Sequence, residues 1–129
     1  APRVVAEMAG KRGADAFDNQ TLIMHRSFRS DTWDDWLGQF RLDLRRLKSV
    51  VEFDNMTAVA RATERGGGIA LVPALVCEPW FERGALARLE GFEYPARDAY
   101  YLVARRDDIA RSELRVFTDW MIEQFQVPG

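Results

Sequence analysis

Residues 61–76 read RATERGGGIALVPALV, a stretch in which three glycines separate an amphipathic segment from an apolar run. A phosphate-binding loop requires the order strand, glycines, helix, usually with a lysine after the glycines. Here the order is helix, glycines, strand, and no lysine follows. We therefore interpret Gly66 as the left-handed residue that ends a helix, with Gly67 and Gly68 turning the chain closely into a strand. A phosphate site at these glycines is the weaker alternative.

The segments on either side of the glycines predict one helix and one strand. Residues 55–65 place apolar side chains at helical steps, with Asp54 or Asn55 as the expected cap. Residues 69–72 (IALV) predict a short strand that is fit for burial on both faces, and Pro73 begins the next predicted helix.

The same alternation runs along the whole chain. Further strands are predicted at 3–8, 21–24, 49–53, 86–89 and 99–104, further helices at 31–40, 74–82 and 112–126, a helical turn at 14–18, and a loop at 91–98. Asp31 is the expected cap of its helix, and the last helix has an expected buried stripe of Leu114, Phe117, Met121 and Phe125. Strands that alternate with helices indicate an α/β fold, a parallel-rich sheet flanked by helices.

The composition is typical of one soluble globular domain, with 129 residues, 47% hydrophobic and 29% charged. The net charge of −2, from 18 basic and 20 acidic residues that are well mixed, argues against a nucleic-acid-binding face within this chain. No apolar run is long enough to cross a bilayer, and the first residues lack the apolar core of a signal peptide. The single Cys77 cannot form an internal disulfide, so we expect a reducing, cytoplasmic setting.

Two strand-to-helix steps carry candidate ligand-binding residues. The first step is the loop from His25 to Ser30 (HRSFRS). In open α/β sheets ligands gather beyond the carboxyl ends of strands, where backbone N–H groups favour anions and an arginine can clamp a carboxylate. A solvated surface loop explains these residues equally well.

The second step, Phe53 to Met56, has the same geometry, although Asp54 or Asn55 could serve only as a helix cap. Arg26 or Arg29 adds positive charge, and the apolar side chains of the two steps add walls. This mixture suits a small organic anion with an apolar part, such as a carboxylate metabolite. The candidate ligand-binding residues are Ser27, Phe28, Arg29, Phe53, Asp54, Asn55 and Met56.

Catalytic and metal chemistry find little support in the sequence. His25 is the only histidine, and Cys77 is typical of a buried small hydrophobe. No spacing of His, Cys or carboxylates predicts a metal site, and we expect no catalytic residues and no cofactor. Trp33 and Trp36 lie three residues apart on one predicted helix face. They could line a pocket, but aromatic residues at this spacing favour packing within the core.

An ordered set of motifs resembles the effector-binding domain of LysR-type transcriptional regulators. The motifs are a helix ending in glycine with a GIALVP strand (Gly66–Pro73), a G-x-L step (Gly84–Leu86), a YYLV strand (Tyr100–Val103) and a last helix with an aromatic-Trp pair (Phe117–Trp120). The stretch TLIMHRSFRSDTWDDWL, residues 21–37, resembles the subgroup that regulates glycine-cleavage and β-lactamase genes. The resemblance covers the chain from about Arg3 to Phe125.

The resemblance implies a fold like that of type II periplasmic binding proteins, in which a ligand cleft lies between two α/β lobes. It implies that both candidate loops face this cleft. The chain would begin at a first crossing strand near residues 3–8, cover the second lobe to about residue 100, and return through a crossing strand and last helix at about 99–126. The absence of an initiator methionine before Ala1 fits this expectation of a partial domain. Most of the first lobe and the helix-turn-helix that reads DNA would then lie outside the chain.

Three functions compete on this basis. The first is a ligand-sensing regulatory domain, with a small-molecule effector, DNA binding only through the absent domain, and a homo-oligomer. The second is a lobe of a solute-binding protein, which shares the fold. The third is a small α/β enzyme.

Overall fold

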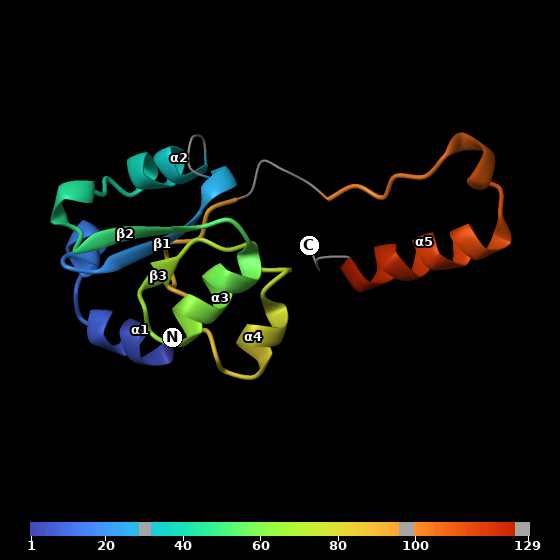
Figure 1. Cartoon of the computed structure of the whole chain (residues 1–129). Coiled ribbons are helices and arrows are strands. Elements are labelled where there is room, and N and C mark those ends of the chain that lie inside the picture. Colours follow the sequence, from blue (N-terminus) through green and yellow to red (C-terminus); the bar gives the residue numbers. More distant parts are fainter. Residues whose placement is uncertain (29–31, 96–99, 126–129) are drawn as a thin grey trace. The chain divides into compact units, whose positions relative to one another are not determined.

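The computed structural model describes residues 1–28, 32–95 and 100–125 (Figure 1). The chain divides into two compact units, Ala1–Pro95 and Ala96–Gly129. Each unit is described by itself. The first contains the sheet and its core, and the described part of the second contains an extended segment and one long helix.

The first unit is built on a three-stranded parallel sheet. The strands are β1 (Thr21–His25), β2 (Ser49–Phe53) and β3 (Ile69–Ala70), in the order β2-β1-β3. Thr21 to His25 pair with Ser49 to Phe53 in register, and Leu22 and Ile23 pair with Ile69 and Ala70. The central strand and its parallel neighbours confirm the α/β fold class that the alternation predicts.

Helices surround this sheet in the first unit. They are α1 (Pro2–Met8), α2 (Thr32–Gln39), α3 (Met56–Glu64) and α4 (Glu78–Glu82), joined by the short 3-10 turns η1 (Gly13–Phe17), η2 (Arg26–Phe28) and η3 (Leu44–Arg46). The predicted turn at 14–18 and the predicted helices at 31–40 and 55–65 are confirmed to within a residue or two at their ends.

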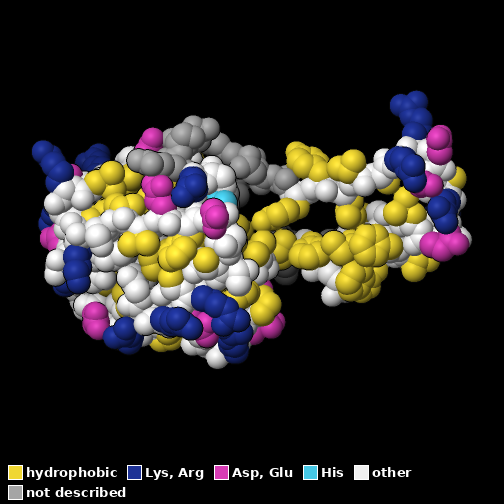
Figure 2. Space-filling view, viewed as in Figure 1, with side chains coloured by type: hydrophobic (Ala, Val, Ile, Leu, Met, Phe, Trp, Pro, Cys, Tyr) yellow, Lys and Arg dark blue, Asp and Glu magenta, His cyan; other side chains and the backbone are white. Residues whose placement is uncertain are grey.

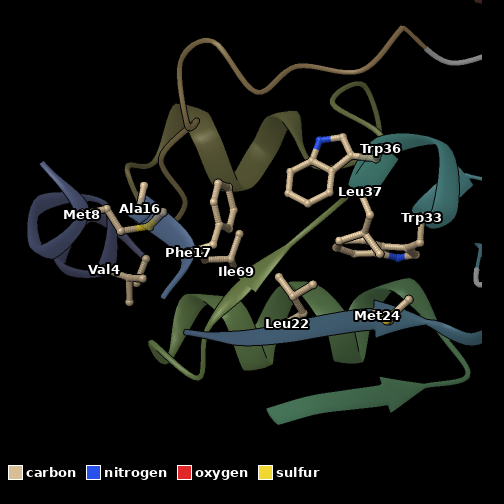
Figure 3. Packing of buried hydrophobic residues seen from close by; sticks show 11 residues of the cluster. Val4, Met8, Ala16, Phe17, Leu22, Met24, Trp33, Trp36, Leu37 and Ile69 are labelled. Atoms are coloured by element: carbon tan, nitrogen blue, oxygen red, sulfur yellow. The ribbon is translucent and has the colours of Figure 1, made fainter. Parts of the chain in front are cut away.

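The main core lies between α2 and the sheet. Leu22 and Met24 point from β1 toward Trp33 and Trp36 of α2, while α3 lies on the other side of β1 (Figure 3). The core cluster also includes side chains from α1, η1 and β3: Val4, Met8, Ala16, Phe17 and Ile69. Phe17 packs edge-on against Trp36, with ring centroids 5.4 Å apart. Trp33 is fully buried, which confirms that this pair of tryptophans packs within the core.

The glycine run ends α3 as the sequence predicts. Gly66 has a φ of 78°, in the left-handed region that favours glycine. Its N–H donates to Thr63 O at 2.9 Å, and the Gly67 N–H donates to Ala62 O at 3.0 Å. These two bonds form a Schellman motif, which satisfies carbonyls at the end of the helix. Gly68 is buried, and a Cβ there would overlap the carbonyl oxygen of Thr21.

The predicted strand at residues 3–8 is wrong, because Pro2–Met8 form α1. Val4 and Met8 are the buried side chains of this helix, at a spacing of four that matches a helix rather than the period of two of a strand. Pro2 in the first turn loses no helical hydrogen bond. The Arg3 guanidinium donates to the Arg65 carbonyl at 3.2 Å and so ties α1 to the end of α3.

Three other predictions in the first unit need correction. The strand predicted at 69–72 is confirmed only for Ile69–Ala70, and the helix predicted at 74–82 forms only at Glu78–Glu82. The Pro73 carbonyl accepts the Cys77 N–H at 3.1 Å, which closes a single turn at residues 74–77 before α4 begins at Glu78. Residues 86–89 form no strand, although Leu86 is buried.

The described part of the second unit contains the 3-10 turn η4 (Arg106–Asp108) and the helix α5 (Ser112–Phe125). The helix confirms the prediction at 112–126, whose last residue lies outside the described part, as do Ala99 and Asp31. The predicted strand is wrong for residues 100–104, which form no strand, and Val103 is 91% exposed. No described residue pairs with this segment to complete the backbone hydrogen bonds of a strand.

The stripe predicted for the last helix is not buried by the described residues of the second unit. Phe117 and Phe125 are 48% and 47% exposed, while Leu114 and Met121 are only partly covered. Figure 2 shows hydrophobic side chains gathered along α5. The helix thus has the amphipathic pattern of a packed element, but the described residues of its own unit leave most of its apolar side chains uncovered.

Candidate functional site

The carboxyl ends of β1 and β2 lie side by side. His25 and Phe53, the last residues of the two strands, are paired in register. The chain leaves β1 into η2 and leaves β2 into α3, so the two candidate loops start from neighbouring points of one sheet edge. We call the residues that follow these two strand ends, 26–28 and 54–56, the rim. This juxtaposition is the arrangement in which open α/β sheets bind ligands.

His25 and Ser27 form a hydrogen-bonded pair at the β1 end of the rim. The Ser27 N–H donates to His25 Nδ1 at 3.2 Å, and Ser27 Oγ lies 2.6 Å from the same nitrogen. The histidine side chain therefore caps the η2 turn in the way that Asx side chains cap turns. Ser27 and Arg26 are exposed at this end, so their polar groups reach solvent.

The β2 end of the rim is the start of α3. Of the two expected caps, Asn55 holds the position, because its Oδ1 accepts the Ala58 N–H at 2.8 Å. Its Nδ2 donates to Asp54 Oδ1 at 3.2 Å. Asp54 and Asn55 are exposed, whereas Phe53 and Met56 are half-buried. The polar and apolar groups expected at this step are therefore both at the surface of the rim.

Two of the predicted site residues cannot be placed. Arg29 lies outside the described residues, and the Phe28 side chain does as well. Among the other site residues, Phe53 is the strand partner of His25, which lies two residues before Ser27, and Asp54, Asn55 and Met56 follow Phe53 along the chain.

A second set of contacts fastens the end of the first unit onto α2. Trp36 Nε1 donates to the Phe92 carbonyl at 2.9 Å, and the Tyr94 hydroxyl donates to Asp35 at 3.1 Å. The Phe92 ring also packs against Phe17, with centroids 4.8 Å apart. These partners are 59 or 56 residues apart in sequence, so no local pattern could have indicated them.

Ion pairs gather at the opposite edge of the sheet, where β1 and β2 begin. Arg46 bridges Asp15 at 2.7 Å and Asp18 at 2.5 Å. Hydrogen bonds from Arg45 hold the pKa of Asp43 at about 2, well below its ordinary range. These residues precede β1 and β2, so the ion pairs lie at the amino ends of the strands. The rim lies at the opposite, carboxyl ends.

Cys77 lies in a second cluster of buried residues with Ala60 and Leu86, and its side chain is fully covered. Burial raises the pKa of the thiol, which keeps it neutral and confirms its interpretation as a small hydrophobe. In the part of the chain that the structure describes, no three His, Cys, Asp or Glu side chains gather where they could hold a metal ion. None of the described helices has the length and apolar character needed to cross a membrane.

Comparison with known proteins identifies the family. The sequence model of the LysR substrate binding domain family matches residues 5–126. The HTH-type transcriptional activator AmpR of Citrobacter koseri is 27% identical over 113 residues, which cover 88% of this chain and 38% of that protein. AmpR of Rhodobacter capsulatus is 30% identical over 99 residues, which cover 77% of this chain and 34% of that protein.

The chain thus spans little more than a third of the length of these relatives. No solved structure gives a significant match. Domains of this family have the type II periplasmic-binding-protein-like fold, with which the parallel sheet and its helices agree. The chain belongs to the LysR substrate-binding domain family, the effector-binding regulatory domains of LysR-type transcriptional regulators.

Proposed function

We propose that the rim is the part of this domain that binds the effector, and that the effector is a small organic anion with an apolar part. The residues proposed to bind it are Ser27, Phe28, Asp54, Asn55 and Met56 of the rim, together with Arg29 and Phe53 directly next to it in the sequence. The observation that supports this proposal is the in-register pairing of His25 with Phe53, which starts both loops from adjacent strand ends.

The chemistry of the β2 end favours an anion. The first-turn N–H groups of an α-helix have no partner within the helix, and the helix dipole is positive there. At α3 the Asn55 side chain accepts one of these N–H groups, and the other first-turn N–H groups point toward the amino end of the helix. Arg26 and Arg29 add positive charge, while Phe53 and Met56 offer partly covered apolar surface. A carboxylate with a hydrophobic part can accept hydrogen bonds from the N–H and guanidinium groups and can also pack against the apolar side chains.

We further propose how this chain relates to a longer regulator. Residues from about 3 to 100 form the second lobe, and residues from about 99 to 126 return to a first lobe that lies mostly outside the chain. DNA is then read by a separate helix-turn-helix domain, and the protein acts in the cytoplasm as a homo-oligomer without catalysis. The relatives named as transcriptional activators favour this assignment over a transport lobe or an enzyme.

Titration of the full-length regulator with a panel of carboxylates tests the site. Removing the Arg29 guanidinium by Arg29→Ala is expected to weaken a bound carboxylate by roughly tenfold or more, because a charge-assisted hydrogen bond contributes about 1.5–3 kcal/mol. Met56→Ala should weaken the binding of only those carboxylates that carry an apolar part.

Lys48→Ala is the matched control, since it removes an exposed positive charge just before the opposite end of β2. The Lys48→Ala variant should bind the carboxylates with the same affinity as the parent. A carboxylate that binds equally well to the parent, Arg29→Ala and Met56→Ala would place the effector elsewhere, and the arginines would then be a solvated surface.

A further inference from the structure

The direction of the hydrogen bonds between Ser27 and His25 can be derived from their geometry. The backbone N–H of Ser27 lies 3.2 Å from His25 Nδ1, and a backbone N–H can only donate. Nδ1 is therefore an acceptor, and the neutral imidazole carries its proton on Nε2.

This tautomer fixes the role of the Ser27 hydroxyl. Its Oγ lies 2.6 Å from the same Nδ1, and because that nitrogen accepts, the hydroxyl must donate. A serine hydroxyl has one proton and two acceptor lone pairs. With the proton directed at His25, the exposed oxygen of Ser27 presents lone pairs to its surroundings.

A second acceptor stands at the other end of the rim. Asp54 directly follows Phe53, the strand partner of His25, and its carboxylate is exposed. It accepts one hydrogen bond from Asn55 Nδ2, and an ionised carboxylate has room for several more donors. Oxygen acceptors therefore follow both strand ends.

We propose that the ligand of this rim carries a hydrogen-bond donor, an ammonium or N–H group, that binds Ser27 Oγ, with the Asp54 carboxylate as the acceptor that follows the neighbouring strand end. The inference rests on the proposed function and narrows its ligand class from organic anions in general to amino-substituted organic acids. A plain carboxylate oxygen at this point would meet the lone pairs of Ser27, or would turn the hydroxyl away from His25 at the cost of a hydrogen bond.

The position of the His25 ring proton, on which this proposal depends, can be measured without any ligand. His25 is the one histidine of the chain, so its imidazole ¹⁵N signals need no assignment. In mildly alkaline buffer we expect the Nε2-protonated tautomer in the 129-residue chain and also in Ser27→Ala, where the backbone N–H still donates to Nδ1. A parent chain with Nδ1 protonated overturns the proposal, because the Ser27 hydroxyl would then accept from the ring.

The ligand class is tested with matched pairs that differ only in the amino group: alanine with propionate, and phenylalanine with 3-phenylpropionate. By calorimetry on the full-length regulator, the amino member of a pair should bind about tenfold more tightly, as one charge-assisted hydrogen bond implies. Ser27→Ala should bring the two members within about twofold of each other. Ser49→Ala, which removes an exposed hydroxyl at the opposite end of β2, should leave the preference unchanged.

The outcomes separate this inference from the proposed function. Equal binding of the two members of each pair, or binding of neither, overturns the donor assignment. Other carboxylates that respond to Arg29→Ala and Met56→Ala would still support the rim as the effector site. An amino preference that survives in Ser27→Ala, with the thermal midpoint of the parent, also overturns the role of Ser27.

Discussion

At the scale of single residues, the sheet depends on the absence of a side chain at Gly68. The carbonyl carbon of Thr21 lies 3.0 Å from the position of a Cβ there, and its oxygen lies closer still. The approach allows Ile69, the next residue, to pair with Leu22 of the central strand. A larger residue has to push the backbones of β1 and β3 apart.

Gly68→Ala is therefore expected to destabilise the chain by about 1–3 kcal/mol, the usual cost of forced backbone shifts. Gly38→Ala is the matched control, because Gly38 lies within α2 and nothing lies within 4 Å of its added methyl group. The control should be neutral or more stable by about 0.5–1 kcal/mol, since alanine favours the helix. Urea unfolding of the two variants measures both, and equal midpoints would contradict the close approach at Gly68.

Residue-scale features were predictable from sequence where they depend on local order. Helix, glycines and strand in that order predicted the left-handed Gly66, because only glycine adopts that backbone without strain. The direction of the His25–Ser27 bonds depends on distances of a few tenths of an ångström. A histidine two residues before a serine at a strand end was the only signal, and it does not say which atom donates.

At the scale of elements, β3 is short but central to packing. Ile69 is 7% exposed and belongs to the main core cluster, together with Phe17 and Trp33. Its neighbour Ala70 is only half-buried, so most of the burial of this strand depends on one side chain.

Ile69→Asp should destabilise the chain by about 3–5 kcal/mol, because it leaves a buried charge without a partner. Ile69→Val is the conservative comparison and should cost only about 0.5–1.5 kcal/mol. Thermal and denaturant melts of both variants check the core assignment. An aspartate variant that melts like the parent would show that β3 is not buried.

Elements were predicted well where periodicity and capping agree, and poorly where tertiary contacts decide. Asn55 and the apolar face of residues 55–65 predicted α3 to within a residue or two. The adjacent Val4 and Val5 in α1 favour a strand by propensity alone, but the contacts of Val4 and Met8 with the core select a helix. At residues 100–104 the propensity is again that of a strand, and no described neighbour pairs with the segment.

At the scale of the whole molecule, the two units differ in how completely they are packed. The first has a core of fully buried side chains such as Trp33, Leu22 and Val59. In the described part of the second, no residue of α5 is buried, and the adjacent extended segment has Tyr101 82% exposed. The pattern of residues 112–126 predicted the apolar stripe, but a sequence pattern cannot say whether its partner lies in the same chain.

An exposed apolar stripe of this kind favours association, and we predict that the chain self-associates through α5. The predicted stripe of Leu114, Phe117, Met121 and Phe125, with the neighbouring Trp120 and Ile122, forms this surface, and Phe117, Trp120, Ile122 and Phe125 are each at least 47% exposed. Sedimentation velocity should show a dimer or larger species that increases with protein concentration. Trp120→Lys should shift the distribution toward monomer, because burying a charge at the interface opposes association. Asp119→Asn raises the net charge by the same one unit at the exposed neighbouring position, keeps the stripe, and should associate like the parent. A chain that stays monomeric at the highest concentration, or two variants that behave alike, would contradict this role of α5.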